Sequence, residues 1–225
     1  MSAGVPVRVV IVDDEPIVRD GLTMYLDGAE DIEVVARLSN GVELLDYLNA
    51  HHIDLVLMDV RMPVMDGSTA LSRLTVAHPQ VRVLFMTSFD DEEIVYQLLS
   101  HGGHGFLLKN ATPEEIRAAV RAVIDGGVPV SPTVNARIVR EAASQYRRRS
   151  QLEDFGLSER ESDVLKLLCQ AASNREIAKR LSLSESTVKA YVSTIMTRMG
   201  CTSRLHVVVT AFEQGLVSPK DFTRP

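Results

Sequence analysis

The sequence predicts an α/β fold, a five-stranded parallel sheet built from strand–helix repeats, followed by an all-α helix-turn-helix domain. Three observations predict it. Five short apolar runs alternate with helical patterns over roughly the first 130 residues. From Leu157 onward the patterns are helical alone. The third apolar run ends on Asp59, which opens the string Asp59-Val60-Arg61-Met62-Pro63-Val64-Met65-Asp66-Gly67, a layout suited to a carboxylate that accepts phosphate.

The length of 225 residues suits about two domains. We predict a first domain over residues 1–130, a linker over 131–154 and a second domain over 155–225. Apolar residues make up 45% of the chain, and no stretch approaches the roughly 20 apolar residues of a membrane helix. Cys169 and Cys201 have no spacing typical of a zinc site or a disulfide framework. A cytoplasmic protein without a membrane partner is therefore expected.

The strands and helices of the first domain follow one another in strict alternation. The predicted strands cover residues 7–12, 34–37, 55–58, 83–86 and 105–108, and four predicted helices cover 16–26, 42–50, 68–77 and 92–100. A fifth helix is predicted from the string Thr112-Pro113-Glu114-Glu115, in which Thr112 caps the helix, and it runs to about residue 125. Because strand–helix–strand crossovers return the chain in the same direction, the sheet is predicted to be parallel.

Polar residues follow four of these strands, at the edge where parallel strands all end. Asp13-Asp14 follow the first strand, Asp59 the third, Thr87 the fourth and Lys109 the fifth. Mg²⁺ is usually held by one or two carboxylates together with water and phosphate oxygens. Asp14 and Asp59 are predicted as direct ligands, with Asp13 in the outer shell. Lys109 and Thr87 are placed to counter the charge of a phosphoryl group and to hydrogen-bond it.

The first domain resembles the receiver domain of bacterial two-component response regulators. The motifs that carry this resemblance are Val12-Asp13-Asp14-Glu15, Leu57-Met58-Asp59-Val60-Arg61-Met62-Pro63, Met86-Thr87-Ser88 and Gly105-Phe106-Leu107-Leu108-Lys109. The resemblance implies that Asp59 accepts phosphate from a sensor histidine kinase. It also implies that Mg²⁺ is bound by Asp13, Asp14 and the backbone carbonyl of Arg61, and that Thr87 and Phe106 move on activation.

Charge is distributed unevenly between the two halves of the chain. Residues 1–130 hold 9 Lys and Arg against 20 Asp and Glu, a net charge of −11, whereas residues 131–225 hold 15 against 10, a net charge of +5. The acidic half suits a bound cation, and the basic half suits phosphates. Part of the basic excess is the run Arg147-Arg148-Arg149, which we interpret as a solvated linker.

Three helix starts follow closely in the second domain. Ser158-Glu159-Arg160-Glu161 and Ser173-Asn174-Arg175-Glu176 are both capping boxes ahead of apolar stripes. Ser182-Leu183-Ser184 is short enough to be the turn between crossed helices, with Ser184 capping a helix to about Met199 and Gly200 ending it. This spacing predicts a helix-turn-helix.

The third of these helices has an apolar face and a face of short polar residues. Val188, Val192, Ile195 and Met199 recur at steps of four, three and four and are predicted to face inward. The opposite face carries Lys189, Ala190, Ser193 and Thr197, which permit close approach to base edges in a major groove.

The second domain resembles the LuxR/FixJ type of DNA-binding domain. The residues that carry the resemblance include Leu157-Ser158-Glu159-Arg160-Glu161, Ser173-Asn174-Arg175-Glu176-Ile177-Ala178, Thr187-Val188-Lys189 and Arg204. It implies that Thr187, Lys189 and Arg204 approach DNA, and that the last helix, 205–214, is a dimer contact. The predicted DNA-contacting residues are Ser184, Thr187, Lys189, Ala190, Ser193 and Arg204.

Together the two resemblances imply a transcriptional regulator of the NarL/FixJ class and not an enzyme. Phosphate on Asp59 is expected to promote dimerisation and binding to double-stranded promoter DNA. A phosphatase or phosphotransferase is disfavoured, because Val60 and Arg61 follow Asp59 where such enzymes carry a second acid. The remaining alternative is a phosphorelay or protein-interaction module whose helical domain does not bind DNA.

Overall fold

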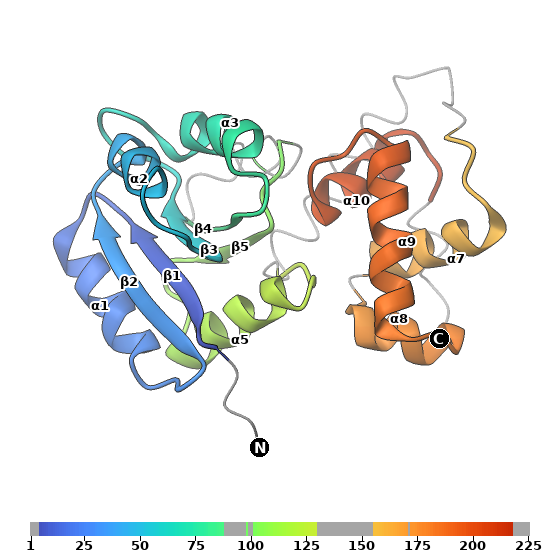
Figure 1. Cartoon of the computed structure of the whole chain (residues 1–225), viewed down its shortest axis with the longest axis horizontal. Coiled ribbons are helices and arrows are strands. Elements are labelled where there is room, and N and C mark those ends of the chain that lie inside the picture. Colours follow the sequence, from blue (N-terminus) through green and yellow to red (C-terminus); the bar gives the residue numbers. More distant parts are fainter. Residues whose placement is uncertain (1–4, 88–97, 99–100, 130–154, 171, 218–225) are drawn as a thin grey trace.

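The chain folds into an α/β unit and a helical unit that lie side by side (Figure 1). A computed structural model describes residues 5–87, 98, 101–129, 155–170 and 172–217. Three predictions fall mainly or wholly outside these residues: the linker, the C-terminal end of the chain, and the helix over 92–100 apart from Leu98. The proposed domain boundaries therefore stay predictions.

The sheet of the α/β unit is parallel throughout, as the sequence predicts. Its strands are β1 (Val7–Val12), β2 (Ile32–Leu38), β3 (Leu55–Asp59), β4 (Arg82–Thr87) and β5 (Gly105–Leu108), in the order β2-β1-β3-β4-β5. The central strand β3 is buried along its whole length. All five strands therefore end at one edge of the sheet, where Asp13, Asp59 and Lys109 follow or close their strands.

Apolar side chains pack on both faces of the sheet, because the strands are covered by helices on each side. On one face, Val9, Ile11 and Leu57 pack with residues of α1 (Pro16–Leu26) and α5 (Pro113–Ile124). On the other face, Val10, Met58 and Phe85 pack with residues of α2 (Gly41–Leu48) and α3 (Gly67–Ala77). We call the second group the α2–α3 cluster. α5 begins at the predicted capping box, with Thr112 as the cap.

The helical unit contains α7 (Glu159–Cys169), α8 (Asn174–Leu181), α9 (Glu185–Arg198) and α10 (Arg204–Glu213). Both predicted capping boxes are confirmed, at Ser158 and at Ser173. The short turn between α8 and α9 is made by Ser182, whose φ of 55° is left-handed, and Ser184 caps α9. Val188, Ile195 and Met199 are buried in the core of this unit and Val192 packs half-buried against it, which confirms the predicted inward stripe.

The two units share a packed contact through α10. Val207 and Phe212 of α10 lie in the core of the helical unit, whereas Leu205 and Val209 lie in the α2–α3 cluster of the other unit. At the start of α10 the buried Ser203 hydroxyl donates to the carbonyl of Gly103 at 3.1 Å. α10 is thus buried on both sides. No helix among the described residues is long and apolar enough to cross a membrane.

Candidate phosphorylation site and DNA-contact surface

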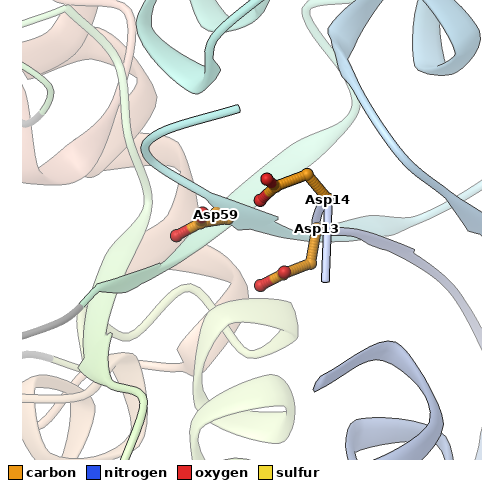
Figure 2. Close-up of side chains that lie close together, drawn as sticks. All are labelled: Asp13, Asp14 and Asp59. Carbon is orange, nitrogen blue, oxygen red and sulfur yellow. The ribbon is translucent and has the colours of Figure 1, made fainter. Parts of the chain in front are cut away.

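Three carboxylates meet at the sheet edge where β1 and β3 end. Figure 2 shows Asp13 and Asp14, which follow β1, and Asp59, which closes β3, around a common space. One ligand oxygen from each residue lies within 4.8 Å of the others. Asp13 is 1% exposed and Asp59 is 6% exposed, whereas Asp14 is exposed. The predicted acidic cluster therefore forms, with one member open to solvent and two beneath it.

The loop that follows Asp59 returns to the end of β3 at Gly67. Its amide donates to the carbonyl of Val60 at 3.0 Å. A Cβ at position 67 would lie 2.5 Å from the carbonyl oxygen of Asp59, so only glycine allows this approach. Asp66 caps α3 by accepting from the amide of Thr69. The sequence Asp66-Gly67 therefore starts a helix while keeping the loop against the end of β3.

Lys109 lies among the carboxylates. Its Nζ is 2.9 Å from Asp13 Oδ2, 3.2 Å from Asp59 Oδ1 and 3.7 Å from Glu15 Oε1. Its position is fixed by the main chain, because its amide donates to the carbonyl of Thr87 at 2.8 Å and so continues the pairing of β5 with β4. The structure thus places the predicted cation within contact distance of the predicted phosphoacceptor.

Burial and crowding of like charges act together on Asp59. Burial is the main cause that raises the pKa of Asp59 to about 6; the charge of Lys109 opposes it and the charge of Asp13 adds to it. For Lys109, burial by itself lowers the pKa, but hydrogen bonds and charges from Asp13 and Asp59 outweigh it, so that the pKa is raised. The site therefore has more negative charge than one lysine balances.

The residues present fit a divalent cation. Asp13 Oδ2 is buried and lies 2.9 Å from Lys109 Nζ, a single contact that leaves a lone pair of the oxygen available. An anionic oxygen with spare acceptor capacity beside two further carboxylates is the donor set that Mg²⁺ prefers. Arg61, whose carbonyl is the fourth predicted ligand, lines a groove of about 450 Å³ together with Asp14 and Asp66. Its carbonyl thus belongs to the loop that borders the acidic cluster.

The two residues predicted to move on activation are both buried. Thr87 is 1% exposed at the end of β4, and Phe106 in β5 is fully buried. The Phe106 ring is tilted against that of Phe85, with their centroids 5.5 Å apart. The carbonyl of Thr87 accepts from the amide of Lys109, so Thr87 lies beside the site. Ser88, from the same motif, lies outside the described residues.

Sequence reasoning missed two residues beside the acidic cluster. Glu15 approaches Lys109, and its own amide donates to Asp13 Oδ1 at 2.9 Å. Arg19, one turn into α1, donates from Nη1 to the carbonyl of Asp13 at 2.5 Å. The i to i+4 spacing of Glu15 and Arg19 was the available signal, because it places both at the start of α1. They fix the main chain that presents the two aspartates.

The outer face of α9 carries the predicted DNA contacts. Lys189, Ala190 and Ser193 are exposed. Ser184 accepts from the amide of Thr187 and its hydroxyl lies 2.7 Å from that of Thr187, so both help to start the helix. Lys189 and Ser193 also line a cleft of about 570 Å³ whose other wall includes residues of the α/β unit. In this arrangement, part of the predicted DNA-contact face of α9 faces the α/β unit.

Arg204 differs from the other predicted DNA contacts because it is buried, at 8% exposure. Its guanidinium donates to the carbonyls of Gly126 and Ala172 and to Asn174 Oδ1. Burial lowers the pKa of Arg204 to about 10, which still leaves it charged at neutral pH. A DNA contact by Arg204 therefore requires a different arrangement of the two units. Asn174, 4% exposed, was not singled out from the sequence.

Two family models match the two units. Residues 9–121 match the response regulator receiver domain. Residues 156–211 match the luxR family of bacterial regulatory proteins. The first match covers most of β1, the other four strands and the acidic cluster, and the second covers α7, α8, α9 and most of α10. The two resemblances inferred from the sequence are confirmed.

Characterised relatives match along most of the chain. The transcriptional regulatory protein LnrK of Bacillus subtilis is 33% identical over 93% of this chain and 98% of its own length. The oxygen regulatory protein NreC of Staphylococcus aureus is 35% identical over 93% of this chain and 99% of its own length. The response regulator ChrA, from a heme-sensing two-component system, has a crystal structure that aligns with a TM-score of 0.51. Its sequence is 34% identical, and the alignment covers 94% of this chain and 99% of the ChrA chain. The chain therefore belongs to the family of two-component response regulators that join a receiver domain to a LuxR-type DNA-binding domain.

Proposed function

We propose that the protein is a transcriptional regulator that phosphate on Asp59 activates. The observation that carries this proposal is the contact of Lys109 Nζ with Asp59 Oδ1 at 3.2 Å, inside a cluster whose carboxylates lie within 4.8 Å of one another. A carboxylate between a cation and a metal-binding set is arranged as a nucleophile toward phosphorus. The phosphoryl donor is a sensor histidine kinase.

In the transfer, an oxygen of Asp59 attacks the phosphorus while the bond from phosphorus to the donor nitrogen breaks. Lys109 balances the charge of the incoming group, and the Thr87 hydroxyl donates to one of its oxygens once it is attached. Asp13, Asp14, Asp59 and the carbonyl of Arg61 would hold Mg²⁺, which would supply charge stabilisation for the phosphoryl oxygens. A phosphoryl group adds about −1.5 to −2 charges, so it draws Lys109 and Thr87 toward position 59.

The DNA-binding half of the proposal rests on α9. Its outer face presents Lys189 and short side chains, and Ser184 and Thr187 lie at its start. A helix of this shape fits the major groove, with Arg204 reaching the backbone. The relative LnrK is a transcriptional regulatory protein, which supports the same role. Phosphorylation is proposed to favour dimers that bind paired half-sites through two α9 helices.

The first experiment tests the phosphoacceptor. Incubation of the full chain with a small acyl phosphate and Mg²⁺ should add one phosphoryl group, measured by intact mass. Asp59→Asn should abolish the addition, and a chelator should prevent it. Asp20→Asn, which removes an exposed acid of α1 with an ion pair to Arg37, is the matched control and should label normally. Full labelling of Asp59→Asn would disprove the assignment.

The second experiment tests DNA binding by the phosphorylated chain. Lys189→Ala should weaken binding to a labelled duplex and reduce the salt slope by about one, because one phosphate or base contact of that charge is lost. Lys166→Ala, on the exposed side of α7, is the control of equal charge change. A chain that accepts phosphate yet binds no duplex at low salt would favour the protein-interaction alternative.

A further inference from the structure

Two donors of the helical domain hold the C-terminal end of receiver helix α5. Arg204 Nη1 donates to the carbonyl of Gly126 at 2.7 Å, and Asn174 Nδ2 donates to the carbonyl of Asp125 at 3.2 Å. These two carbonyls are consecutive and directly follow α5, which ends at Ile124. Figure 1 shows this end of α5 next to α8, where Asn174 is the first residue. The donor pair therefore binds two neighbouring oxygens at once.

The donor pair is assembled entirely within the helical domain. Asn174 Oδ1 accepts from Arg204 Nη1 at 2.5 Å. The carboxamide oxygen of Asn174 therefore holds the guanidinium, and the carboxamide nitrogen of the same side chain lies beside it as a second donor. The carbonyl of Ala172 accepts from the other terminal nitrogen of Arg204. Among the described residues, the receiver domain supplies the two carbonyl oxygens to this contact. Removing the receiver domain would leave both donors in place and uncover them.

The two carbonyls resemble an anion, but only in part. The last carbonyls of a helix have no partner within the helix and carry the negative end of its dipole, roughly half an elementary charge. The three acceptors around Arg204 are one carboxamide and two main-chain carbonyls, and none carries a full charge. A guanidinium binds a phosphate or carboxylate more strongly than a neutral carbonyl. Among the described residues, the buried Arg204 therefore has no anionic hydrogen-bond acceptor in this arrangement, although the charge of Glu176 also acts on it.

We propose that Asn174 and Arg204 form a binding site for one phosphodiester of DNA, and that the carbonyls of Asp125 and Gly126 occupy that site while the receiver domain is docked. Two adjacent donors match the two non-bridging oxygens of a phosphodiester. This inference rests on the proposed DNA binding and adds Asn174 as a ligand to it. DNA and the end of α5 then compete for the same two donors.

Gly126 gives a way to disturb the docked occupant without altering the helical domain. Its φ of 76° is left-handed, and a Cβ there would lie 2.8 Å from Asn174 Nδ2. Gly126→Ala therefore obstructs the receiver side of the contact alone. The full chain carrying Gly126→Ala should bind a labelled random-sequence duplex several-fold more tightly than the unphosphorylated parent, because phosphate contacts do not depend on sequence. Unchanged affinity would contradict competition for the site.

The ligand role of Asn174 is tested in the Gly126→Ala background, where the docked contact is already weakened. Asn174→Ala should lower duplex affinity about tenfold, as expected for one hydrogen bond to a charged group. It should leave the salt slope unchanged, because the side chain is neutral. Arg204→Gln should lower the affinity and also reduce the slope by about one. Arg37→Gln, which removes a charge from β2, is the control and should change neither quantity.

The outcomes separate this inference from the function on which it rests. Circular dichroism first establishes that each variant is folded. Equal duplex affinity with and without Asn174→Ala, in chains that do bind DNA, would overturn the site alone. Absence of duplex binding by the parent chain, phosphorylated or not, would overturn the proposed DNA-binding function and the site with it.

Discussion

Val64, in the loop after Asp59, combines a β-branched side chain with a left-handed backbone. Its φ is 68°, and the amide of Met65 donates to the carbonyl of Pro63 at 2.8 Å, which closes a three-residue turn around it. The side chain is 84% exposed, so packing does not compensate for the strain. A non-glycine residue in this region is disfavoured by about 1–2 kcal/mol. The strain lies five residues from the proposed phosphoacceptor.

Relief of this strain should stabilise the protein. Val64→Asn should raise the free energy of unfolding by about 1 kcal/mol, because asparagine tolerates positive φ better than valine does. The measurement is urea denaturation followed by circular dichroism. Val76→Asn is the matched control, since Val76 is also 84% exposed but lies in the right-handed helix α3, and it should bring no gain. Equal effects of the two substitutions would show that strain at position 64 is not the cause.

At the level of single residues, the acidic cluster could be predicted from the sequence and the domain contact could not. Asp13, Asp59 and Lys109 each stand at the end of an apolar run, and parallel strands bring such ends together whatever the details of packing. Arg204 was predicted as a DNA contact, which stays a prediction, and its burial depends on where the other domain lies. Local sequence around position 204 carries no information on that placement.

The start of β5 is joined to β4 by a pair of hydrogen bonds that involve a histidine. The amide of His104 donates to the carbonyl of Val83 at 2.8 Å, and His104 Nδ1 accepts from the amide of Val83 at 3.2 Å. Only a ring nitrogen without a proton can accept this bond. Burial is the main cause that lowers the pKa of His104 from 6.5 to about 4, and the positive charge of Arg82 acts in the same direction. The strand contact therefore requires the neutral ring.

This contact should make stability depend on pH in a defined direction. The unfolded chain takes up a proton near pH 6.5, while the folded chain resists it until about pH 4. The contribution of His104 is therefore complete above about pH 6.5 and is lost as the pH falls toward 4. Between pH 7 and pH 4.5 the parent should lose about 2 kcal/mol more than His104→Gln, measured by urea denaturation. Parallel losses in the two proteins would contradict this account.

The order and type of the elements could be predicted because each is encoded locally. Thr112, Ser158 and Ser173 each precede a glutamate by three residues, and all three start a helix with a capping box. Among the residues that the structure describes, the errors were confined to element ends: β2 begins two residues earlier than predicted, at Ile32. Hydrogen bonding along β1 extends the strand past its apolar run, which explains the difference.

For the whole molecule, α10 is the element that belongs to both domains. Leu205 and Val209 lie in the α2–α3 cluster of the receiver domain, while Val207 lies in the helical core. The periodicity of α10 shows that it is apolar on several sides, but it cannot show which side faces which domain. That assignment depends on long-range packing, so the sequence left it open.

Truncation on the two sides of α10 should have different consequences. Leu205→Ala removes packing between the domains and should favour their separation by about 2 kcal/mol, seen as a larger radius of gyration in X-ray scattering. Val207→Ala, the matched control, should lower the stability of the helical domain but leave the radius unchanged in the folded protein. A compact Leu205→Ala chain would show that Leu205 does not hold the domains together.

In the proposed activation, the apolar side of α10 would make the response depend on how much of the protein a cell contains. Once the domains separate, Leu205 and Val209 meet water, which is unfavourable by about 25 cal/mol for each Å² of apolar surface. Reclosure is a first-order process, whereas covering the same side chains with those of a second chain is second-order. At a higher concentration of the protein, a larger fraction of the chains with separated domains therefore pairs with a second chain before its own domains close again. Under the proposed function, the rate of synthesis of the protein would thus set its response threshold together with the kinase signal.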